Sequence, residues 1–274
     1  MEIEMRARWV QWDDARYFAD CEYVSASMLK LYREDRDEYI KRYVTNESKG
    51  RSSRAMAIGT ALHQWVLEGV EPVSSWTCSY DPRNPDHIGV GGPYGPACPT
   101  DLRGARKFAQ EHNLPGMVLN GKEGTAVQAM HDALRSSHEA TDLLHAAVRR
   151  EEVVLWAEEV DGHIIPCKAK VDMVCEIDGE TILVDLKTSR HPTMLGFAHS
   201  GAEYGYAYQA AHYLAGLRAT GVAARRAIFL VVCNKAPYSV FPFEFTDEEL
   251  DYARRTNLVG LGALAEDRMM GWSL

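Results

Sequence analysis

The stretch spanning residues 167–190 constrains the fold most, because its pattern predicts a β-hairpin whose register is fixed by the turn. Two runs with branched apolar residues at alternate positions flank Asp178-Gly179. This dipeptide favours a two-residue type I′ turn, since both central residues of that turn need positive φ. The turn pairs Ile177 with Glu180, and that pairing sets the partner of every other residue in the hairpin.

The predicted register brings two carboxylates together. Asp172 is expected directly opposite Asp185, with Cβ atoms about 4.5–5.5 Å apart, and Lys170 directly opposite Lys187. Like charges in this arrangement destabilise a sheet unless a cation or a raised pKa compensates, and carboxylate oxygens suit Mg²⁺ or Mn²⁺. A surface hairpin with solvated charges is the alternative. The other face is wholly apolar and is expected in a core: Val171, Met173, Cys175, Ile177, Ile182, Val184 and Leu186.

A third strand precedes this hairpin and brings a further acidic residue to the same end of the sheet. A second turn at Asp161 joins the two, giving a three-stranded meander. With a two-residue turn Glu151 lies opposite Asp172, whereas a bulge at Pro166, which lacks an N–H, brings Glu152 there. The register leaves both alternatives open.

Helical patterns lie on both sides of the meander. The helix predicted over 52–69 carries Gly59, where we expect another segment to approach the backbone because glycine costs about 1 kcal/mol in a helix interior. His63 follows one turn later, and a lone helical histidine is more often a packing residue than a ligand. Residues 27–44 predict one amphipathic helix, with Ser25 or Ser27 as its N-cap.

The composition is that of an ordinary globular protein: 274 residues, 46% hydrophobic and 25% charged. We expect one domain over 1–274, with a helical elaboration over 20–150 and a Pro- and Gly-rich loop over 72–104.

The sequence shows no signal peptide and no apolar run of about 18 residues, which favours the cytoplasm. A net charge of -9 is not typical of a protein that coats nucleic acid, and the six cysteines show no C-x-x-C spacing.

Five motifs, in order along the chain, resemble those of the RecB-type branch of the PDDEXK nucleases, with the closer likeness to the exonuclease VIII (RecE-like) phage recombination exonucleases. They are Gly59-x-x-x-His63, a glutamate at 151 or 152, Lys170-x-Asp172, Asp185-Leu186-Lys187 and Gln209-x-x-x-Tyr213. The likeness extends over nearly the whole chain. The family's spacing favours Glu152 over Glu151. Lys170-Val171-Asp172 stands where the family often has Arg-Pro-Asp, and the loop over 72–104 does not align.

The resemblance implies an α/β fold with a PDDEXK, or restriction-endonuclease-like, core: a mixed central sheet with an antiparallel meander, flanked by helices. The element order along the chain also predicts such a sheet. The implied ligands of one or two Mg²⁺ or Mn²⁺ ions are His63, Asp172, Asp185, the carbonyl of Leu186 and Glu152. Lys187 would orient the attacking water and stabilise charge on the phosphate, and Gln209 and Tyr213 would support the site or contact DNA.

The implied substrate is double-stranded DNA with a free end, degraded from the 5′ side to leave a 3′ single strand for an annealing protein. Related enzymes form rings, so we expect a homo-oligomer. A restriction-type or repair endonuclease and an inactive DNA-binding relative are the alternatives. An iron–sulfur nuclease would need three clustered cysteines after the Gln209 helix, where the sequence has only Cys233.

Overall fold

The computed structural model describes residues 6–50, 53–74, 102–111 and 113–272. Most of the loop predicted over 72–104 therefore lies outside the described residues, as do Cys78 and Cys98. The four cysteines within the described ranges are free thiols. In the described part of the chain, no helix combines the length and the apolar character that crossing a membrane requires.

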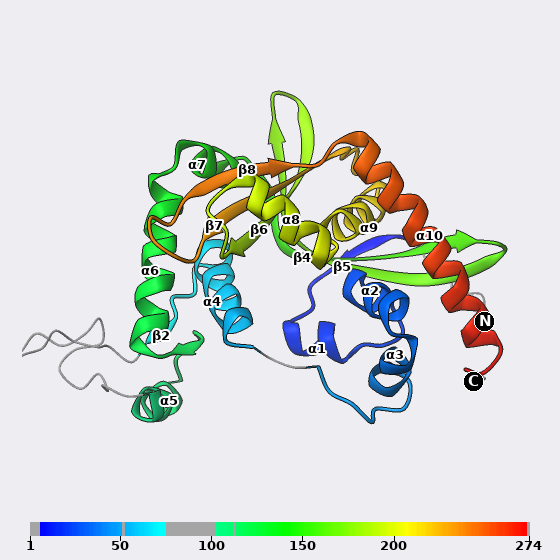
Figure 1. Ribbon diagram of the computed structural model, residues 1–274, viewed down its shortest axis with the longest axis horizontal. Coiled ribbons are helices and arrows are strands. Elements are labelled where there is room, and N and C mark those ends of the chain that lie inside the picture. Colours follow the sequence, from blue (N-terminus) through cyan, green and yellow to red (C-terminus); the bar gives the residue numbers. More distant parts are fainter. Residues whose placement is uncertain (1–5, 51–52, 75–101, 112, 273–274) are drawn as a thin grey trace, which may run out of the picture.

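A mixed sheet forms the centre of the protein (Figure 1). Among the described residues it has six strands, in the order β1 (Arg8–Val10), β4 (Ala147–Val160), β5 (His163–Ile177), β6 (Glu180–Ser189), β7 (Arg226–Cys233) and β8 (Val240–Glu244). Strands β6 and β7 run parallel, and the other neighbours are antiparallel. A small parallel pair, β2 (Val73–Ser74) and β3 (Val118–Leu119), lies apart from it. The predicted mixed sheet with an antiparallel meander is confirmed.

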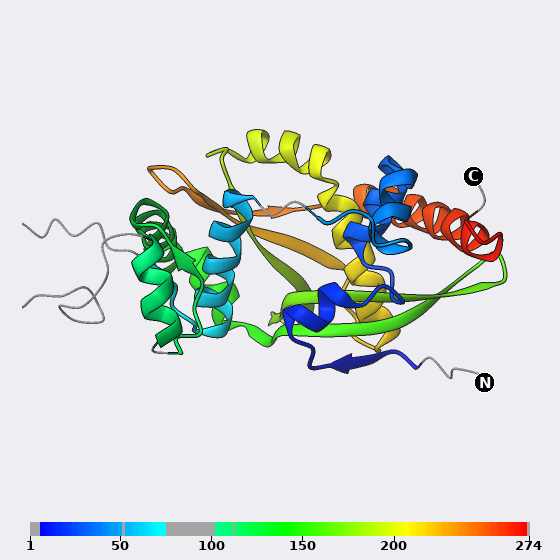
Figure 2. The same ribbon diagram turned by 90° about the horizontal axis from the view of Figure 1, so that it is seen from below.

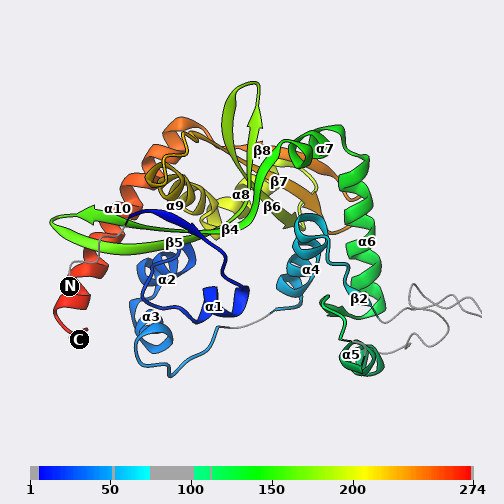
Figure 3. The same cartoon turned by 180° about the vertical axis from the view of Figure 1, so that it is seen from behind.

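Helices cover both faces of this sheet. They are α1 (Asp14–Ala19), α2 (Ala26–Glu34), α3 (Arg36–Tyr43), α4 (Arg54–Glu68), α5 (Leu102–Glu111), α6 (Gly121–Ser136), α7 (His138–His145), α8 (Met194–Tyr204), α9 (Tyr206–Ala219) and α10 (Asp247–Met269). Helices α4 to α7 gather at one end of the molecule, and α1 to α3 lie towards the other, where α10 ends (Figures 1 and 3). The structure therefore has the α/β architecture that the sequence predicts.

The two faces of the sheet bury two separate cores. Helices α2, α9 and α10 pack on one face, with a core that includes Trp156, Val171, Phe197, Phe229 and Leu261. Helices α4, α6 and α7 pack on the other, with a core that includes Leu62, Met130, Met173, Val184 and Leu186. The sheet between them is apolar on both sides over most of its area. Polar side chains buried at the boundary of the two cores therefore need specific partners.

Both turns of the meander form at the predicted Asp-Gly dipeptides. Asp178 and Gly179 have φ of 52° and 80°, and Ile177 pairs with Glu180. The second turn likewise contains two residues, and its register runs on through the pairing of Ala157 with Pro166. Of the two alternatives that the sequence left open, the regular two-residue turn is therefore the observed one, and β5 has no bulge at Pro166.

The hairpin register, by contrast, does not extend as far as predicted. The β5–β6 ladder ends at the pair Met173 and Val184, so the expected opposition of two aspartates and two lysines is wrong. Just beyond this point Asp172 Oδ2 accepts the N–H of Leu186 at 2.8 Å, so a side chain takes the place of a ladder carbonyl. Val171 packs in the core that faces α9, whereas Met173 packs in the core that faces α4, so the predicted single apolar face is divided at Asp172.

Two helical predictions are also refined by the structure. Residues 27–44 form two helices rather than one, since Asp35 both ends α2 and caps α3 by accepting the Glu38 N–H. Ser25 is the N-cap of α2. Gly59 lies against β6, but a Cβ added there would sit 3.6 Å from Thr188 Oγ1, an ordinary contact. Another segment does approach the backbone at Gly59, but the space there would also accommodate an alanine.

Candidate metal centre

Three side chains from three different elements converge beside the end of the β5–β6 ladder. They are His63 from α4, Glu151 from β4 and Asp172 from β5. Each offers one ligand atom, and these atoms all lie within 4.8 Å of one another. Helix α4 packs on both β4 and β6, which carries the imidazole to the sheet. Two carboxylates and one imidazole so close together form a donor set suited to a divalent cation.

The hydrogen bonding of His63 leaves one ring nitrogen available as a ligand. Its Nε2 lies 2.6 Å from the carbonyl oxygen of Leu186, and because a carbonyl only accepts, Nε2 is the donor. Burial, followed by the nearby Lys187 ammonium, lowers the pKa of His63, so the ring is neutral at pH 7. Nδ1 then carries a lone pair that faces Asp172 Oδ2 at 3.4 Å. Two acceptors facing each other indicate a site for a proton or a metal ion.

Glu151, and not Glu152, supplies the third carboxylate. Its neighbours in β4 pair with the neighbours of Asp172 in β5, which sets Glu151 across from Asp172. Glu151 has a φ of 51°, a left-handed conformation that is rare in a strand and aims the side chain into the site. Glu152 instead forms an ion pair with Arg149, with Nη1 and Oε2 2.8 Å apart. The predicted site residue is therefore displaced by one position, because the strand is irregular there.

The two carboxylates are held in an environment that disfavours their negative charge. Burial, with the Asp185 carboxylate adding to it, raises the pKa of Asp172 well above its ordinary value. Burial and the Asp172 charge raise the pKa of Glu151 to about 7. Glu151 Oε1 is buried and accepts no hydrogen bond from the described residues. A divalent cation fits these residues, because it would neutralise the carboxylates and satisfy the unpartnered oxygen.

Asp185 and Lys187 form an adjoining pair rather than part of this group of three. Asp185 is 1% exposed, its Oδ2 accepts from Gln209 Nε2 at 3.0 Å, and its Oδ1 contacts the Lys187 ammonium. Burial lowers the pKa of Lys187, but Asp185 and Asp172 outweigh it and the net pKa is raised, so the lysine stays charged. The ammonium is therefore fixed beside the carboxylates and carries a positive charge into the site.

The remaining predicted residues have supporting positions. Tyr213 is buried, its hydroxyl hydrogen-bonds with the Gln209 side chain, and burial raises its pKa. The carbonyl of Leu186 is engaged by His63. Tyr213 is thus placed to support Gln209 from within the core.

Sequence reasoning missed Tyr206 and Asp14. The ring of Tyr206 lies 5.3 Å from the Lys187 ammonium, and Asp14 forms an ion pair with Lys170, which also contacts Glu151. Tyr206 precedes Gln209 by less than one helical turn, a spacing that offered a weak signal. No local signal connects Asp14 to a strand that begins more than a hundred residues later.

Comparison with known proteins adds a family and a fold. A family model described as a PDDEXK-like domain of unknown function (DUF3799) matches residues 25–258. None of the curated proteins matches this sequence. A crystal structure of a protein from Eubacterium rectale named "Putative exonuclease" is 15% identical and has a TM-score of 0.64, covering 97% of this chain and 89% of that chain. A crystal structure of SSO0001 is 17% identical over 56% of this chain and 69% of that chain, with a TM-score of 0.30, which is too low to carry an argument.

Proposed function

Because the chain belongs to the family of PDDEXK-like domains, we propose that it is a metal-dependent deoxyribonuclease that degrades linear double-stranded DNA from its ends. The family and the fold support a nuclease. The observation that carries the proposal is the convergence of His63, Glu151 and Asp172, with the charged Lys187 alongside. The finer parts, cleavage from the 5′ side and a role in recombination, rest on the motif resemblance.

His63, Glu151 and Asp172 would hold the cation, with Asp185 next to them. When bound, Mg²⁺ or Mn²⁺ would supply positive charge that activates water and neutralises the phosphate. The Lys187 ammonium is fixed by Asp185 and would stabilise the charge that grows on a phosphate oxygen during hydrolysis. Gln209 holds the second oxygen of Asp185, so it orients the lysine indirectly.

The direct test is digestion of linear and circular duplex DNA of the same sequence with Mg²⁺ or Mn²⁺. We expect loss of the linear DNA alone, release of a 5′ label before a 3′ label, and no activity in EDTA. Asp172→Asn should abolish cleavage, because it removes a carboxylate from the site, and it serves as the control for contaminating nuclease. Cleavage of circular DNA would instead indicate an endonuclease, and DNA binding without cleavage would indicate an inactive relative.

We also propose that the protein forms a ring-shaped homo-oligomer and delivers its 3′ single strand to an annealing protein in the cytoplasm of a bacterial or phage-infected cell. These parts rest on the resemblance alone. Light scattering coupled to size-exclusion chromatography tests the first of them. A monomer at micromolar concentration, with and without DNA, would contradict the ring.

A further inference from the structure

The segment over residues 8–24 precedes the region that the family model matches, yet it lies along the strands that carry the candidate site. Strand β1 pairs with β4, with Val10 opposite Val153 (Figure 2). At the other end of the segment Val24 forms a bridge with Cys167 in β5. The segment is therefore attached at both ends to the strands that present Glu151 and Asp172.

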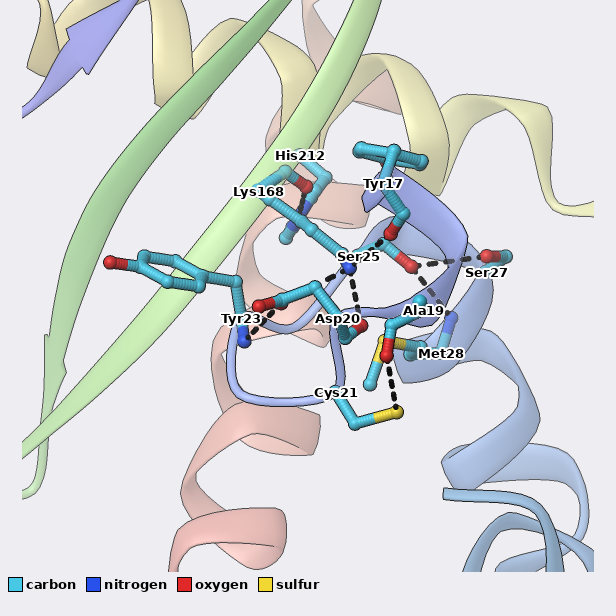
Figure 4. Close-up of polar contacts among 10 residues, drawn as sticks. All are labelled: Tyr17, Ala19, Asp20, Cys21, Tyr23, Ser25, Ser27, Met28, Lys168 and His212. Carbon is cyan, nitrogen blue, oxygen red and sulfur yellow. Dashed lines mark hydrogen bonds and ion pairs between the residues drawn. The ribbon is translucent and has the colours of Figure 1, made fainter. Parts of the chain in front are cut away.

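A buried lysine fixes the middle of this segment (Figure 4). Lys168 is 1% exposed, and its ammonium donates to the carbonyl oxygens of Tyr17 and Asp20, each at 2.6 Å. It also lies 3.3 Å from Asp20 Oδ1. A buried ammonium is costly unless all three of its protons have partners, so these contacts strongly favour one position of the segment. Tyr17 packs with Val153 and Leu155 on the same side.

Lys170 follows two residues later in β5, and alternation places it on the same side of the strand as Lys168. Its ammonium lies 2.7 Å from Asp14 Oδ1 and 2.6 Å from Glu151 Oε2. Asp14 begins α1, the helix that contains Tyr17. Lys170 thus joins a carboxylate of the N-terminal segment to a carboxylate of the metal centre. The contact occupies Oε2 of Glu151, while Oε1 is buried and accepts no hydrogen bond from the described residues.

We propose that Asp14 is a positioning residue of the metal centre, which acts through Lys170 to hold Glu151 with one oxygen directed at the cation. This inference rests on the proposed metal site. Glu151 needs such support because its left-handed backbone is strained and its side chain has rotational freedom. The N-terminal segment is then part of the active site rather than only a cover for the sheet edge.

A purely structural ion pair would tie the segment to the sheet without influencing the metal, and a double-mutant cycle separates the two roles. Asp14→Asn removes the charge that holds Lys170. Asp13→Asn is the matched control, because it removes one charge from the neighbouring residue, and asparagine is equally good at the N-cap position that Asp13 occupies. Glu151→Gln and the double variant Asp14→Asn/Glu151→Gln complete the set. Mn²⁺ affinity is measured by calorimetry without DNA, and folding by urea denaturation.

We expect Asp14→Asn to weaken Mn²⁺ binding by about tenfold, the scale of losing a group that orients a ligand. Asp13→Asn should bind like the wild type. The double variant should bind Mn²⁺ no more weakly than Glu151→Gln, because Asp14 acts only through Glu151. Lys170→Arg should retain more affinity than Lys170→Met, since arginine still bridges two carboxylates.

Equal Mn²⁺ affinity in Asp14→Asn and Asp13→Asn would overturn the inference, as would additive losses in the double variant. These readouts need no DNA cleavage, so they remain distinct from the test of the nuclease. A wild-type protein that binds Mn²⁺ with the expected coupling but leaves DNA intact would contradict only the proposed function. Wild-type protein that does not bind Mn²⁺ would overturn the metal centre and this inference together.

Discussion

Replacing Glu151 by glutamine tests the candidate site most directly, because the adjacent Glu152 provides a matched control. Both substitutions remove one negative charge from the same strand. Glu151 faces Asp172 and has a buried oxygen that accepts no hydrogen bond from the described residues, whereas Glu152 pairs with the partly exposed Arg149. The two variants should therefore differ in stability and in metal binding.

The pKa of Glu151 gives the size of the effect on stability. Burial and the Asp172 charge raise that pKa from 4.5 to about 7. One pKa unit corresponds to about 1.4 kcal/mol, so ionising Glu151 costs about 3 kcal/mol more in the metal-free folded protein than in the unfolded chain. The folded protein keeps a proton that the unfolded chain releases. Stability is therefore lost as the pH rises from 4.5 to 7, and the loss is complete above pH 7.

Without metal, Glu151→Gln should raise the free energy of unfolding by up to about 3 kcal/mol at pH 8 and by little at pH 5. Glu152→Gln should lower it by about 0–1 kcal/mol at both pH values, the contribution of a partly exposed ion pair. Urea denaturation in EDTA, followed by circular dichroism, measures both. In Mn²⁺ titrations Glu151→Gln should lose affinity by at least about 10–100-fold, while Glu152→Gln retains the wild-type value.

Two results would refute this reasoning. One is a loss of Mn²⁺ affinity in Glu152→Gln but not in Glu151→Gln, which would restore the carboxylate that the family spacing favours. The other is an equal change in stability for Glu151→Gln at pH 5 and pH 8. That result would show that the charge of Glu151 is not disfavoured in the folded protein.

Three further predictions follow from the geometry. Lys187→Ala should slow DNA cleavage roughly a hundredfold in single-turnover assays at saturating Mn²⁺, with little change in Mn²⁺ affinity. Equal losses in cleavage rate and in Mn²⁺ affinity would assign the lysine a structural role. His63→Ala should weaken Mn²⁺ binding. Because burial lowers the pKa of His63 below its ordinary value of 6.5, the ratio of wild-type to His63→Ala affinity should be the same in Mn²⁺ titrations at pH 7 and pH 8, and a ratio that falls at pH 7 would contradict a neutral imidazole ligand. Gly59→Ala should stabilise the protein by about 1 kcal/mol, because the added Cβ meets only an ordinary contact. Gly216→Ala should destabilise it by about 1–3 kcal/mol, because the added Cβ would lie 2.7 Å from the buried Trp156 ring. Thermal denaturation measures both changes, and the same sign for both would contradict the packing argument.

Features that depend on neighbours in the sequence were predictable. The turn at Asp178 and Gly179 follows from the positive φ that these residues tolerate, and it sets the pairing as far as Met173 and Val184. The capping box of Thr246 and Glu249 likewise marks the start of α10, because each side chain binds the backbone of the other residue. Such interactions are local, so the order of residues determines them.

The residues of the site were only partly predictable. The sequence motifs identify His63, Asp172 and Lys187, but two adjacent glutamates satisfied the strand pattern equally well. The structure distinguishes them because Glu151 takes a left-handed backbone conformation within an irregular strand. Alternation along a strand predicts which face a side chain occupies only while the strand stays regular.

Contacts between distant segments were decided by the tertiary structure alone. The β5–β6 ladder stops at Met173 because Asp172 binds the Leu186 N–H with its side chain, a choice that depends on how β4 and α4 pack against the hairpin. Lys170 was expected opposite another lysine, and it instead lies between Glu151 and Asp14, a residue far earlier in the chain. The sequence by itself determined the turns, the helix caps and the types of residue available for a metal site. Which of them meet was decided by packing, because burial forces each charged group to find a partner wherever the fold brings one within reach.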